Sequence, residues 1–259
     1  MISSEYAKEY QRLIADNISG SRELLFKLIK FLQKHQNEID LDIINNLQNH
    51  FSDFQTIRLF LKKFRIAFEN NRLELFFKEI PTDDRVVYKK IFINLLPYIK
   101  NFQTFITISN SKTILEVLKL ISESNKRLKL IISEGRPNNE GTILAERLAV
   151  NNISTTLITE AQIYQFVQKT DCAIIGADKI LANGNVVNKV GSNLLALACK
   201  EFNIPFYVIS DKSKFCNDNY FIAKELSGSE IFETEKKIEI HNFYFEEINK
   251  ELITKIITD

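Results

Sequence analysis

Residues 104–133 read TFITISNSKTILEVLKLISESNKRLKLIIS, in which two β-rich runs flank an amphipathic segment. Apolar and β-branched residues dominate the runs at 104–108 and 128–132, whereas apolar residues recur at helical spacing over 113–121. A strand, a helix and a second strand in this order form a unit with parallel strands, because the helix provides the crossover between them. This unit decides the predicted fold class.

The same alternation continues towards the C-terminus. β-rich runs follow at 155–158, 173–175 and 206–209. They alternate with amphipathic stretches at 142–151, 161–168 and 193–202. Strands that alternate with helices of these lengths predict a mainly parallel, Rossmann-like sheet covered by helices on both faces.

The part of the chain before residue 101 has a different composition. Of seven glycines, only Gly20 precedes Gly135, and apolar residues recur at helical spacing over 6–98. The predicted class is therefore α/β, with an N-terminal helical domain over 1–100 and a Rossmann-like domain over 101–259.

Composition and charge exclude several function classes. The chain has 259 residues, with 34 Lys and Arg against 33 Asp and Glu, a formal charge of +1. This balance argues against a surface built for nucleic acid or anionic lipid. No run approaches the roughly 18 apolar residues of a membrane span, and residues 1–10 carry charges where a signal peptide would be apolar. We therefore expect a cytoplasmic protein with neither a membrane nor a nucleic-acid partner.

Cysteine and histidine are few. The three cysteines lack CxxC spacing and the three histidines lie far apart in the sequence. An odd number of cysteines without such spacing is typical of buried or incidental thiols. We expect no disulfide, no metal site and no bound cofactor.

Polar residues follow the predicted strands, in the places where ligands of parallel sheets bind. These segments are Ser109-Asn110-Ser111-Lys112, Ser133-Glu134-Gly135-Arg136-Pro137, Thr159-Glu160, Gly176-Ala177-Asp178-Lys179 and Ser210-Asp211-Lys212-Ser213-Lys214. Their glycines, serines, lysines and arginine together predict an anion site.

The strongest local element is NGNVVNKVGS, residues 183–192. Its NG pair is typical of a hairpin turn. Gly191 and Ser192 precede a predicted helix, so free backbone N–H groups and the positive end of the helix dipole are available to an anion, with Lys189 nearby. This pattern favours phosphate binding; alternatively, Ser192 only caps the helix and Lys189 is solvated.

Two charged residues in the other segments have similar alternatives. Asp178 follows a buried strand, where a general acid or base belongs, or it caps the next turn. Arg136, fixed by Pro137, has a planar fork that suits phosphate or carboxylate. A structural ion pair between Arg136 and Glu134 is the default interpretation.

Ser109 and Ser111 end the first run ahead of a helix, where they bind an oxyanion or act as caps. The chain has no GxSxG elbow and no well-placed histidine, so a serine hydrolase is not predicted. It also has no GxGxxG or GxxxxGK[ST] turn, so dinucleotide-binding and P-loop functions are not predicted either.

Five segments then occur in a specific order: SEGRP with a following EG, GADKI, NGNVVNKVGS with an alanine-rich helix, IPFYVIS, and the terminal HNFYFEEINKELITKIITD. In this order they resemble a family of translation-factor subunits and isomerases. It contains the alpha, beta and delta regulatory subunits of the eukaryotic translation initiation guanine-nucleotide exchange factor, ribose-1,5-bisphosphate isomerase and methylthioribose-1-phosphate isomerase. The resemblance covers about 101–259.

The resemblance implies a helical domain on a Rossmann-like domain that also dimerises the protein. In the family's isomerases a phosphosugar lies between the domains, and a cysteine and an aspartate move the protons that interconvert aldose and ketose. The aspartate matches Asp178. The Asn-Lys pair that holds phosphate matches Asn188 and Lys189, and the lysine of a later KF pair matches Lys214.

Two departures from the family decide the predicted function. The isomerase cysteine corresponds to Ser109, and an alkyl alcohol stays protonated without a strong adjacent base, unlike a thiol with a pKa near 8.5. The turn that clamps the second phosphate has an arginine in the isomerases, whereas this chain has Gly20 between serines. The residues and the resemblance together assign ligand or phosphate binding to Asn110, Ser111, Arg136, Asn188, Lys189, Gly191, Ser192, Lys214 and Gly20.

The leading prediction is a regulatory protein related to these initiation-factor subunits. It binds a phosphosugar or nucleoside monophosphate without the usual isomerase chemistry, forms a homodimer or higher homo-oligomer, and has a translation factor as a partner. The alternative is an aldose-ketose sugar-phosphate isomerase in which Asp178 is the acid or base and Ser109 only hydrogen-bonds substrate. A third interpretation is a protein-interaction subunit with no ligand.

Overall fold

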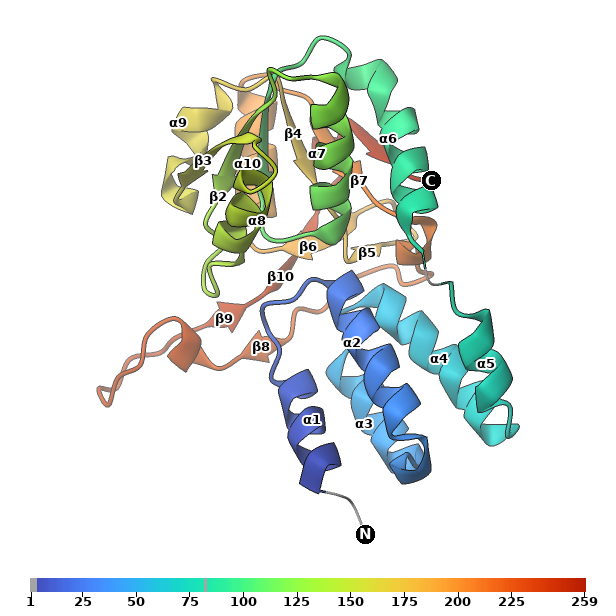
Figure 1. Cartoon of the computed structure of the whole chain (residues 1–259). Coiled ribbons are helices and arrows are strands. Elements are labelled where there is room, and N and C mark those ends of the chain that lie inside the picture. Colours follow the sequence, from blue (N-terminus) through green and yellow to red (C-terminus); the bar gives the residue numbers. More distant parts are fainter. Residues whose placement is uncertain (1–3, 82) are drawn as a thin grey trace. The chain divides into compact units, whose positions relative to one another are not determined.

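The computed structural model describes residues 4–81 and 83–259. The chain divides into two compact units between Asp84 and Arg85 (Figure 1). None of the helices in these ranges is long and apolar enough to cross a membrane.

The N-terminal unit is helical, as the spacing of its apolar residues predicts. Its elements are α1 (Ser4–Ile14), α2 (Ser21–Lys34), η1 (Gln36–Glu38), α3 (Leu41–His50), α4 (Gln55–Glu69) and α5 (Leu73–Glu79). Each of the longer helices buries one apolar stripe, and Leu28, Ile44 and Phe64 are fully buried in the shared core. The Asp40 carboxylate accepts a hydrogen bond from Ile43 N and so caps α3.

The C-terminal unit contains the predicted parallel sheet. Its strands are β1 (Thr104–Ile108), β2 (Lys129–Ser133), β3 (Ser154–Ile158), β4 (Cys172–Ile175), β7 (Phe206–Ile209) and β11 (Lys255–Ile257). They lie in the order β11-β7-β4-β1-β2-β3, and every neighbouring pair is parallel. The α/β class is confirmed, and β11 is a strand that the sequence did not predict.

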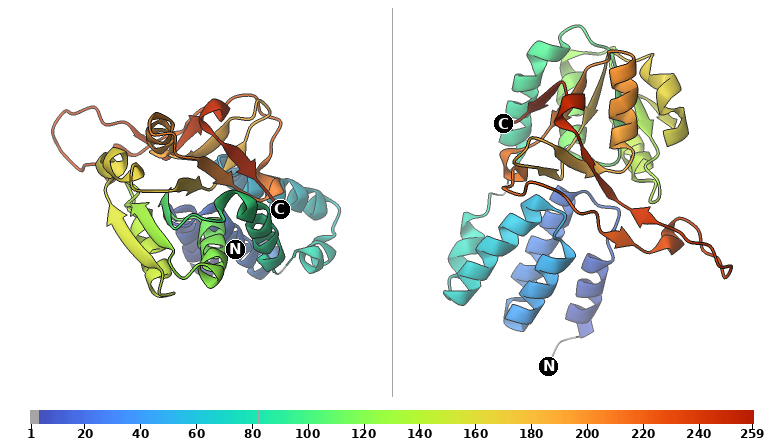
Figure 2. Two further views of the ribbon diagram at one scale, coloured as in Figure 1. Left: turned by 90° about the horizontal axis from the view of Figure 1, so that it is seen from above. Right: turned by 180° about the vertical axis from the view of Figure 1, so that it is seen from behind.

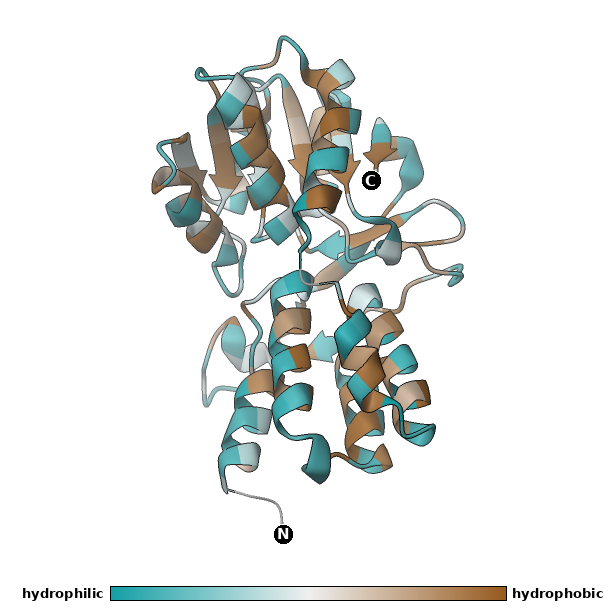
Figure 3. Cartoon of the chain, turned by 45° about the vertical axis from the view of Figure 1, so that its right-hand side comes forward, coloured by the Kyte–Doolittle hydropathy of each residue, from teal (hydrophilic) through white to brown (hydrophobic). Residues whose placement is uncertain are grey.

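Helices cover both faces of this sheet (Figure 2). They are α6 (Arg85–Ile99), α7 (Lys112–Ser124), α8 (Glu140–Ala149), α9 (Ile163–Val167) and α10 (Ser192–Glu201). Phe105 packs in one core with α6, α7 and α8, whereas the adjacent Ile106 packs in a second core with α9 and α10. Successive strand residues point to opposite faces, so strands buried on both sides are apolar throughout (Figure 3).

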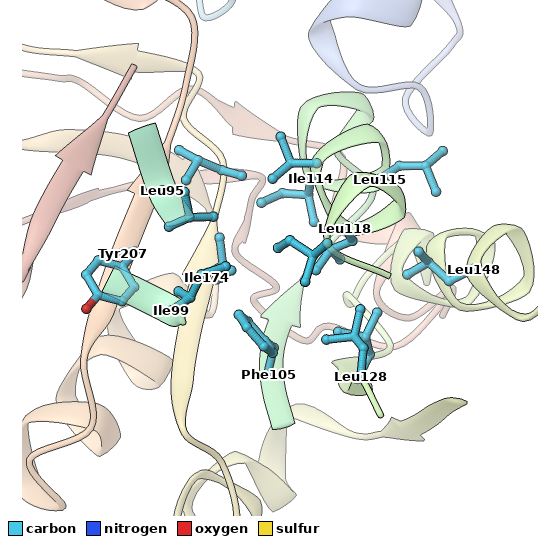
Figure 4. Close-up of a cluster of buried hydrophobic side chains, with 14 of the residues drawn as sticks. Leu95, Ile99, Phe105, Ile114, Leu115, Leu118, Leu128, Leu148, Ile174 and Tyr207 are labelled. Atoms are coloured by element: carbon cyan, nitrogen blue, oxygen red, sulfur yellow. The ribbon is translucent and has the colours of Figure 1, made fainter. Parts of the chain in front are cut away.

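The predicted boundary between residues 100 and 101 is wrong, because α6 belongs to the C-terminal unit. Leu95 and Ile99 of α6 are buried in the same core as Phe105, Ile174 and Tyr207 (Figure 4). A run of helical periodicity continues through α6, so composition alone assigns this helix to the wrong domain.

Two smaller sheets extend from the parallel one. The first is antiparallel, with β5 (Lys179–Ile180), β6 (Val186–Lys189) and β10 (Phe245–Ile248) in the order β10-β6-β5. The predicted NG turn joins β5 to β6, and Gly184 there has a φ of +88°. The second pairs β8 (Glu225–Leu226) with β9 (Asn242–Phe243). Short 3-10 turns are η2 (Glu160–Gln162), η3 (Lys212–Lys214), η4 (Gly228–Glu230) and η5 (Lys250–Leu252).

Candidate functional site

The turn between β6 and α10 is held by its own side chains. Ser192 Oγ donates to the carbonyl of Lys189 at 2.6 Å, and Asn188 Nδ2 donates to Ser192 Oγ at 2.9 Å. Gly191 has a φ of +95°, and a Cβ there would lie 3.1 Å from Cδ1 of Ile108. This close approach brings the start of α10 against the end of β1, as the position of a ligand site in a parallel sheet requires.

Lys189 is buried and points at a carboxylate. Its Nζ lies 2.6 Å from Oε1 of Glu140, and both side chains are 6% exposed. The ammonium also lies 4.3 Å from the centre of the Tyr244 ring. The interpretation in which Lys189 is solvated and Ser192 only caps a helix is therefore wrong, since the Ser192 hydroxyl bonds to Lys189 and Asn188 instead.

Glu140 is the residue of this site that the sequence did not single out. It opens α8, and its Oε1 also accepts a weak hydrogen bond from Ser109 Oγ at 3.5 Å. Burial raises the pKa of the Glu140 carboxyl, and the nearby Lys189 ammonium only partly opposes this rise. The sequence feature that could have identified Glu140 is its position as an acidic residue at the start of the helix that follows SEGRP.

The turn between β2 and α8 places Glu140. Gly135 has a φ of +81°, and its N–H donates to Glu160 Oε1 at 2.7 Å. Gly141 N donates to the carbonyl of Glu134 at 2.8 Å, and a Cβ on Gly141 would lie 1.9 Å from the carbonyl oxygen of Ser133. Only glycine fits there, and the resulting tight turn directs Glu140 back towards the sheet.

A second ion pair joins Asp178 to Lys214. Nζ of Lys214 lies 3.6 Å from Oδ1 of Asp178. Asp178 N donates to the carbonyl of Val187, and the bridge between Ile180 and Phe215 brings η3 alongside β5. The Asp178 carboxylate therefore faces a buried ammonium, and the structure joins two residues that the sequence predicted separately.

The segment after β1 contributes Ser109, Asn110 and Ser111. Ser109 has a φ of +66°, in the left-handed region that non-glycine residues rarely adopt. Ser111 accepts a hydrogen bond from Ile114 N at 3.4 Å and caps α7. A Cβ on Gly176 would lie 3.1 Å from Ser111 Oγ, so the ends of β1 and β4 are adjacent.

Several buried polar atoms near these strand ends make no hydrogen bond within the described ranges. They are Thr107 Oγ1, Asn110 Oδ1, Ser133 Oγ and Glu140 Oε2. Buried polar groups are normally hydrogen-bonded. Atoms of this kind mark places where hydroxyl groups or phosphate oxygens of a ligand, or water molecules, find partners.

Two other predicted residues lie elsewhere. Arg136 is exposed, and its Nη2 donates to the carbonyl of Ile231 at 3.3 Å. The ion pair expected between Arg136 and Glu134 is not found among the described residues, so that default interpretation is wrong. Gly20 is at the N-cap of α2 in the N-terminal unit, with a φ of −66°. Its role as a phosphate contact stays a prediction.

The predicted buried thiols are confirmed for Cys172 and Cys199, which are buried, whereas Cys216 is partly exposed. Within residues 4–81 and 83–259, no group of three or more His, Cys, Asp and Glu side chains is arranged to hold a metal ion.

Comparison with known proteins points to one family. Residues 67–259 match the model of the Initiation factor 2 subunit family. Ribose 1,5-bisphosphate isomerase of Archaeoglobus fulgidus is 33% identical over 170 residues, which are 62% of this chain and 54% of that protein. A putative translation initiation factor eIF-2B subunit 2-like protein of Pyrococcus horikoshii is 46% identical over 110 residues, which are 42% of this chain and 40% of that protein. The chain thus matches about half of the length of these curated relatives, or less.

Solved structures resemble the whole chain. The crystal structure of translation initiation factor eIF-2B from Pyrococcus horikoshii OT3 has a TM-score of 0.79 and 26% identity, covering 99% of this chain and 95% of that one. The 5-methylthioribose 1-phosphate isomerase of the same organism has a TM-score of 0.71 and 18% identity, covering 98% of this chain and 82% of that one. At this identity the second likeness establishes the fold alone.

Proposed function

The chain belongs to the Initiation factor 2 subunit family, and from this premise we propose that it binds a phosphorylated sugar or a nucleoside monophosphate at the carboxyl end of its parallel sheet. The observation that carries the proposal is the buried Lys189 at the end of β6, in the turn that leads to α10. Lysine is rarely buried unless it is paired, and here it lies beside a helix N-terminus and the Asn188 and Ser192 side chains. An anion at this place would meet the buried Lys189 ammonium, which is paired with Glu140, and the positive end of the α10 dipole, where Asn193 N donates to the Glu246 carboxylate.

The sugar part of such a ligand has partners as well. Asn110 Oδ1 and Glu140 Oε2 are buried acceptors that make no hydrogen bond within the described ranges, and Thr107 and Ser133 contribute hydroxyls of the same kind. Hydroxyl groups of a sugar would donate to such acceptors, which accounts for polar atoms that are otherwise costly to bury.

We propose a regulatory role without the family's usual isomerase turnover. Ser109 occupies the position of the proton-moving cysteine. Its contact with Glu140 is 3.5 Å long, and the same Oε1 lies 2.6 Å from Lys189. A carboxylate engaged in this way is a poor base for an alcohol whose unperturbed pKa lies far above neutrality. Action in the cytoplasm as a homodimer or higher homo-oligomer, with a translation factor as a partner, belongs to the same proposal.

The second candidate function is aldose-ketose isomerisation of a sugar phosphate. It is favoured by the 33% identity to a ribose 1,5-bisphosphate isomerase and by the Asp178 carboxylate, which faces Lys214 at 3.6 Å. In this role Asp178 moves the proton and Ser109 only holds a substrate hydroxyl. The Asp178→Asn variant would then lose turnover but keep ligand binding.

A thermal-shift screen tests the proposal. The purified protein is screened against phosphopentoses, ribose 1,5-bisphosphate, 5-methylthioribose 1-phosphate and nucleoside monophosphates, because a ligand that binds the native state raises its melting temperature. We expect a shift that disappears in Lys189→Ala. The Lys189→Ala/Glu140→Gln double variant removes both charges of the pair, so that a lost shift there does not result from an unpaired carboxylate.

Lys78→Ala is the matched control, since Lys78 is an exposed lysine that pairs with Glu74 on α5. Its ligand-induced shift should equal that of the parent protein. A folded protein that gives no shift with any of these compounds would contradict ligand binding and favour a protein-interaction subunit. Turnover of the binding compound by the parent protein would contradict the regulatory role and favour the isomerase.

A further inference from the structure

The ion pair between Lys189 and Glu140 occupies the proposed phosphate site, and we propose that phosphate binds there together with one proton, which Glu140 takes up from solvent. This inference rests on the proposed function. The protonation of Glu140 then determines the pH range in which the site binds phosphate. It also determines which charge state of the phosphate binds.

The proposed site already holds a buried pair of opposite charges before a ligand binds. Nζ of Lys189 lies 2.6 Å from Oε1 of Glu140, and each of the two side chains is only 6% exposed. The positive charge that the family resemblance assigns to phosphate is therefore compensated before any ligand arrives. A phosphate that approaches Lys189 also approaches the Glu140 carboxylate.

The second lysine of the site is compensated in the same way. Lys214 faces Asp178 at 3.6 Å, and their side chains are 4% and 15% exposed. Each of the two ion pairs is neutral, and the Glu246 carboxylate also accepts from Asn193 N at the start of α10 at 2.7 Å, so no net positive charge is left for an anion. A sugar phosphate above pH 7 is close to a dianion, because its second pKa is about 6. Such a charge beside a buried carboxylate favours the protonated form of that carboxylate.

The two oxygens of Glu140 differ in a way that suits protonation. Oε1 accepts from Lys189, whereas Oε2 is buried and makes no hydrogen bond within the described ranges. A proton added to Oε2 turns this unpartnered acceptor into an O–H donor, and Oε1 keeps its contact with Lys189. The new donor supplies a hydrogen bond to a phosphate oxygen. Burial already raises the pKa of this carboxyl, which lowers the cost of adding the proton.

The other groups around Glu140 leave it as the site of proton uptake. Ser109 presents a hydroxyl, Tyr244 lies against Lys189 with the face of its ring, and Glu160 accepts from Gly135 N with its Oε1. Glu160 also lies near the start of α10, since its Cγ would be 3.7 Å from a Cβ on Gly191.

Calorimetric titration with ribose 1,5-bisphosphate tests the inference. Titrations at pH 8 in Tris and in HEPES, which release different heats on ionisation, give the number of protons taken up per ligand bound. We expect about one proton for the parent protein and close to none for Glu140→Gln. The glutamine amide N–H replaces the protonated carboxyl as a donor and needs no proton from solvent, so this variant should bind about tenfold more tightly at pH 8.

The pH profile provides a second readout. The affinity of the parent protein should fall between pH 6.5 and 8.5, and that of Glu140→Gln should stay nearly level above pH 7. Glu146→Gln is the matched control, because Glu146 is exposed on the same helix, and it should behave as the parent protein does. Thermal unfolding without ligand verifies that each variant is folded.

The outcomes separate the two proposals. Equal affinity, proton uptake and pH dependence in the parent protein and Glu140→Gln would overturn the role of Glu140 and leave phosphate binding intact. Lost binding in a folded Glu140→Gln would also overturn it, because the ionised carboxylate would then be the form that contacts the ligand. Absence of binding in all variants would overturn the proposed function and this inference with it.

Discussion

Lys214 Nζ lies 3.6 Å from Asp178 Oδ1, and the pair joins η3 to the first strand of the small antiparallel sheet. The Lys214 side chain is 4% exposed, so water screens its charge only weakly. Asp178 therefore has a structural task besides any part in chemistry. A variant at this position has to be judged on stability as well as on turnover.

Asp178→Asn removes the charge opposite Lys214 at nearly unchanged side-chain volume. We expect the free energy of unfolding to fall by about 1–3 kcal/mol, because the ammonium stays buried while its counter-charge is lost. Urea denaturation at pH 7 measures this change. Glu74→Gln, which removes the carboxylate from the exposed pair with Lys78, is the control and should change stability little. An equally small change in Asp178→Asn would show that the buried pair contributes nothing.

Gly141→Ala tests how closely α8 approaches β2. The added Cβ would lie 1.9 Å from the carbonyl oxygen of Ser133 and 2.9 Å from that of Glu134, so the backbone has to move. We expect a loss of about 3 kcal/mol in unfolding free energy, at the upper end for overpacking. Gly20→Ala is the control, since its φ of −66° suits alanine, and it should cost less than about 1 kcal/mol. Equal losses in the two variants would mean that the β2–α8 turn adjusts freely.

Much of the fold follows from local sequence pattern. The strands β1 and β7 begin and end where the β-rich runs do, because parallel strands buried on both faces are mostly apolar or β-branched. The strands β5, β6 and β10 were not predicted. Lys189 and Glu246 lie in this sheet, and their polar character gives no strand period that a sequence could reveal.

The sequence predicts individual residues of the candidate site, but it does not predict which of these residues contact one another. The sequence indicates Asp178, Lys189 and Lys214 as residues that follow strands or precede helices. It does not indicate that Glu140 meets Lys189, because this contact depends on the tight Gly141 turn and on the place of the last residue of β6 next to the start of α8. Contacts between segments far apart in the chain come from the topology of the whole sheet, which no local pattern contains.

The buried Glu140 should give the protein a characteristic pH dependence of stability. Its pKa in the folded protein is raised mainly by burial, so the folded state holds this proton to a higher pH than the unfolded state. The stabilisation from this group is complete below its ordinary pKa of 4.5 and is lost as the pH rises through the raised value. Relative to Glu140→Gln, the parent protein should therefore lose unfolding free energy as the pH rises above 4.5 through the raised pKa of Glu140.

Urea unfolding of both proteins at several pH values in this range measures the difference. Glu146→Gln should show the same pH dependence as the parent protein, since Glu146 is exposed. Parallel curves for the parent protein and Glu140→Gln would contradict a raised pKa at Glu140.

Ser109 has a left-handed backbone with a φ of +66°, and a further prediction follows from it. A side chain costs about 1–2 kcal/mol in this region, whereas glycine adopts it without steric strain. Ser109→Gly should therefore be more stable than Ser109→Ala by about 1 kcal/mol, since alanine keeps the strain and loses the weak bond to Glu140. Urea denaturation of the two variants measures the difference.

Ser122 provides the matched comparison, because it lies inside α7, where the backbone is right-handed. There the order should be reversed, with Ser122→Ala more stable than Ser122→Gly by about 1 kcal/mol, the difference in helix propensity between the two residues. If the alanine variant is the more stable one at both positions, Ser109 is not strained. A reversal of order between them would establish that Ser109 is strained, and strained residues of this kind cluster at functional sites.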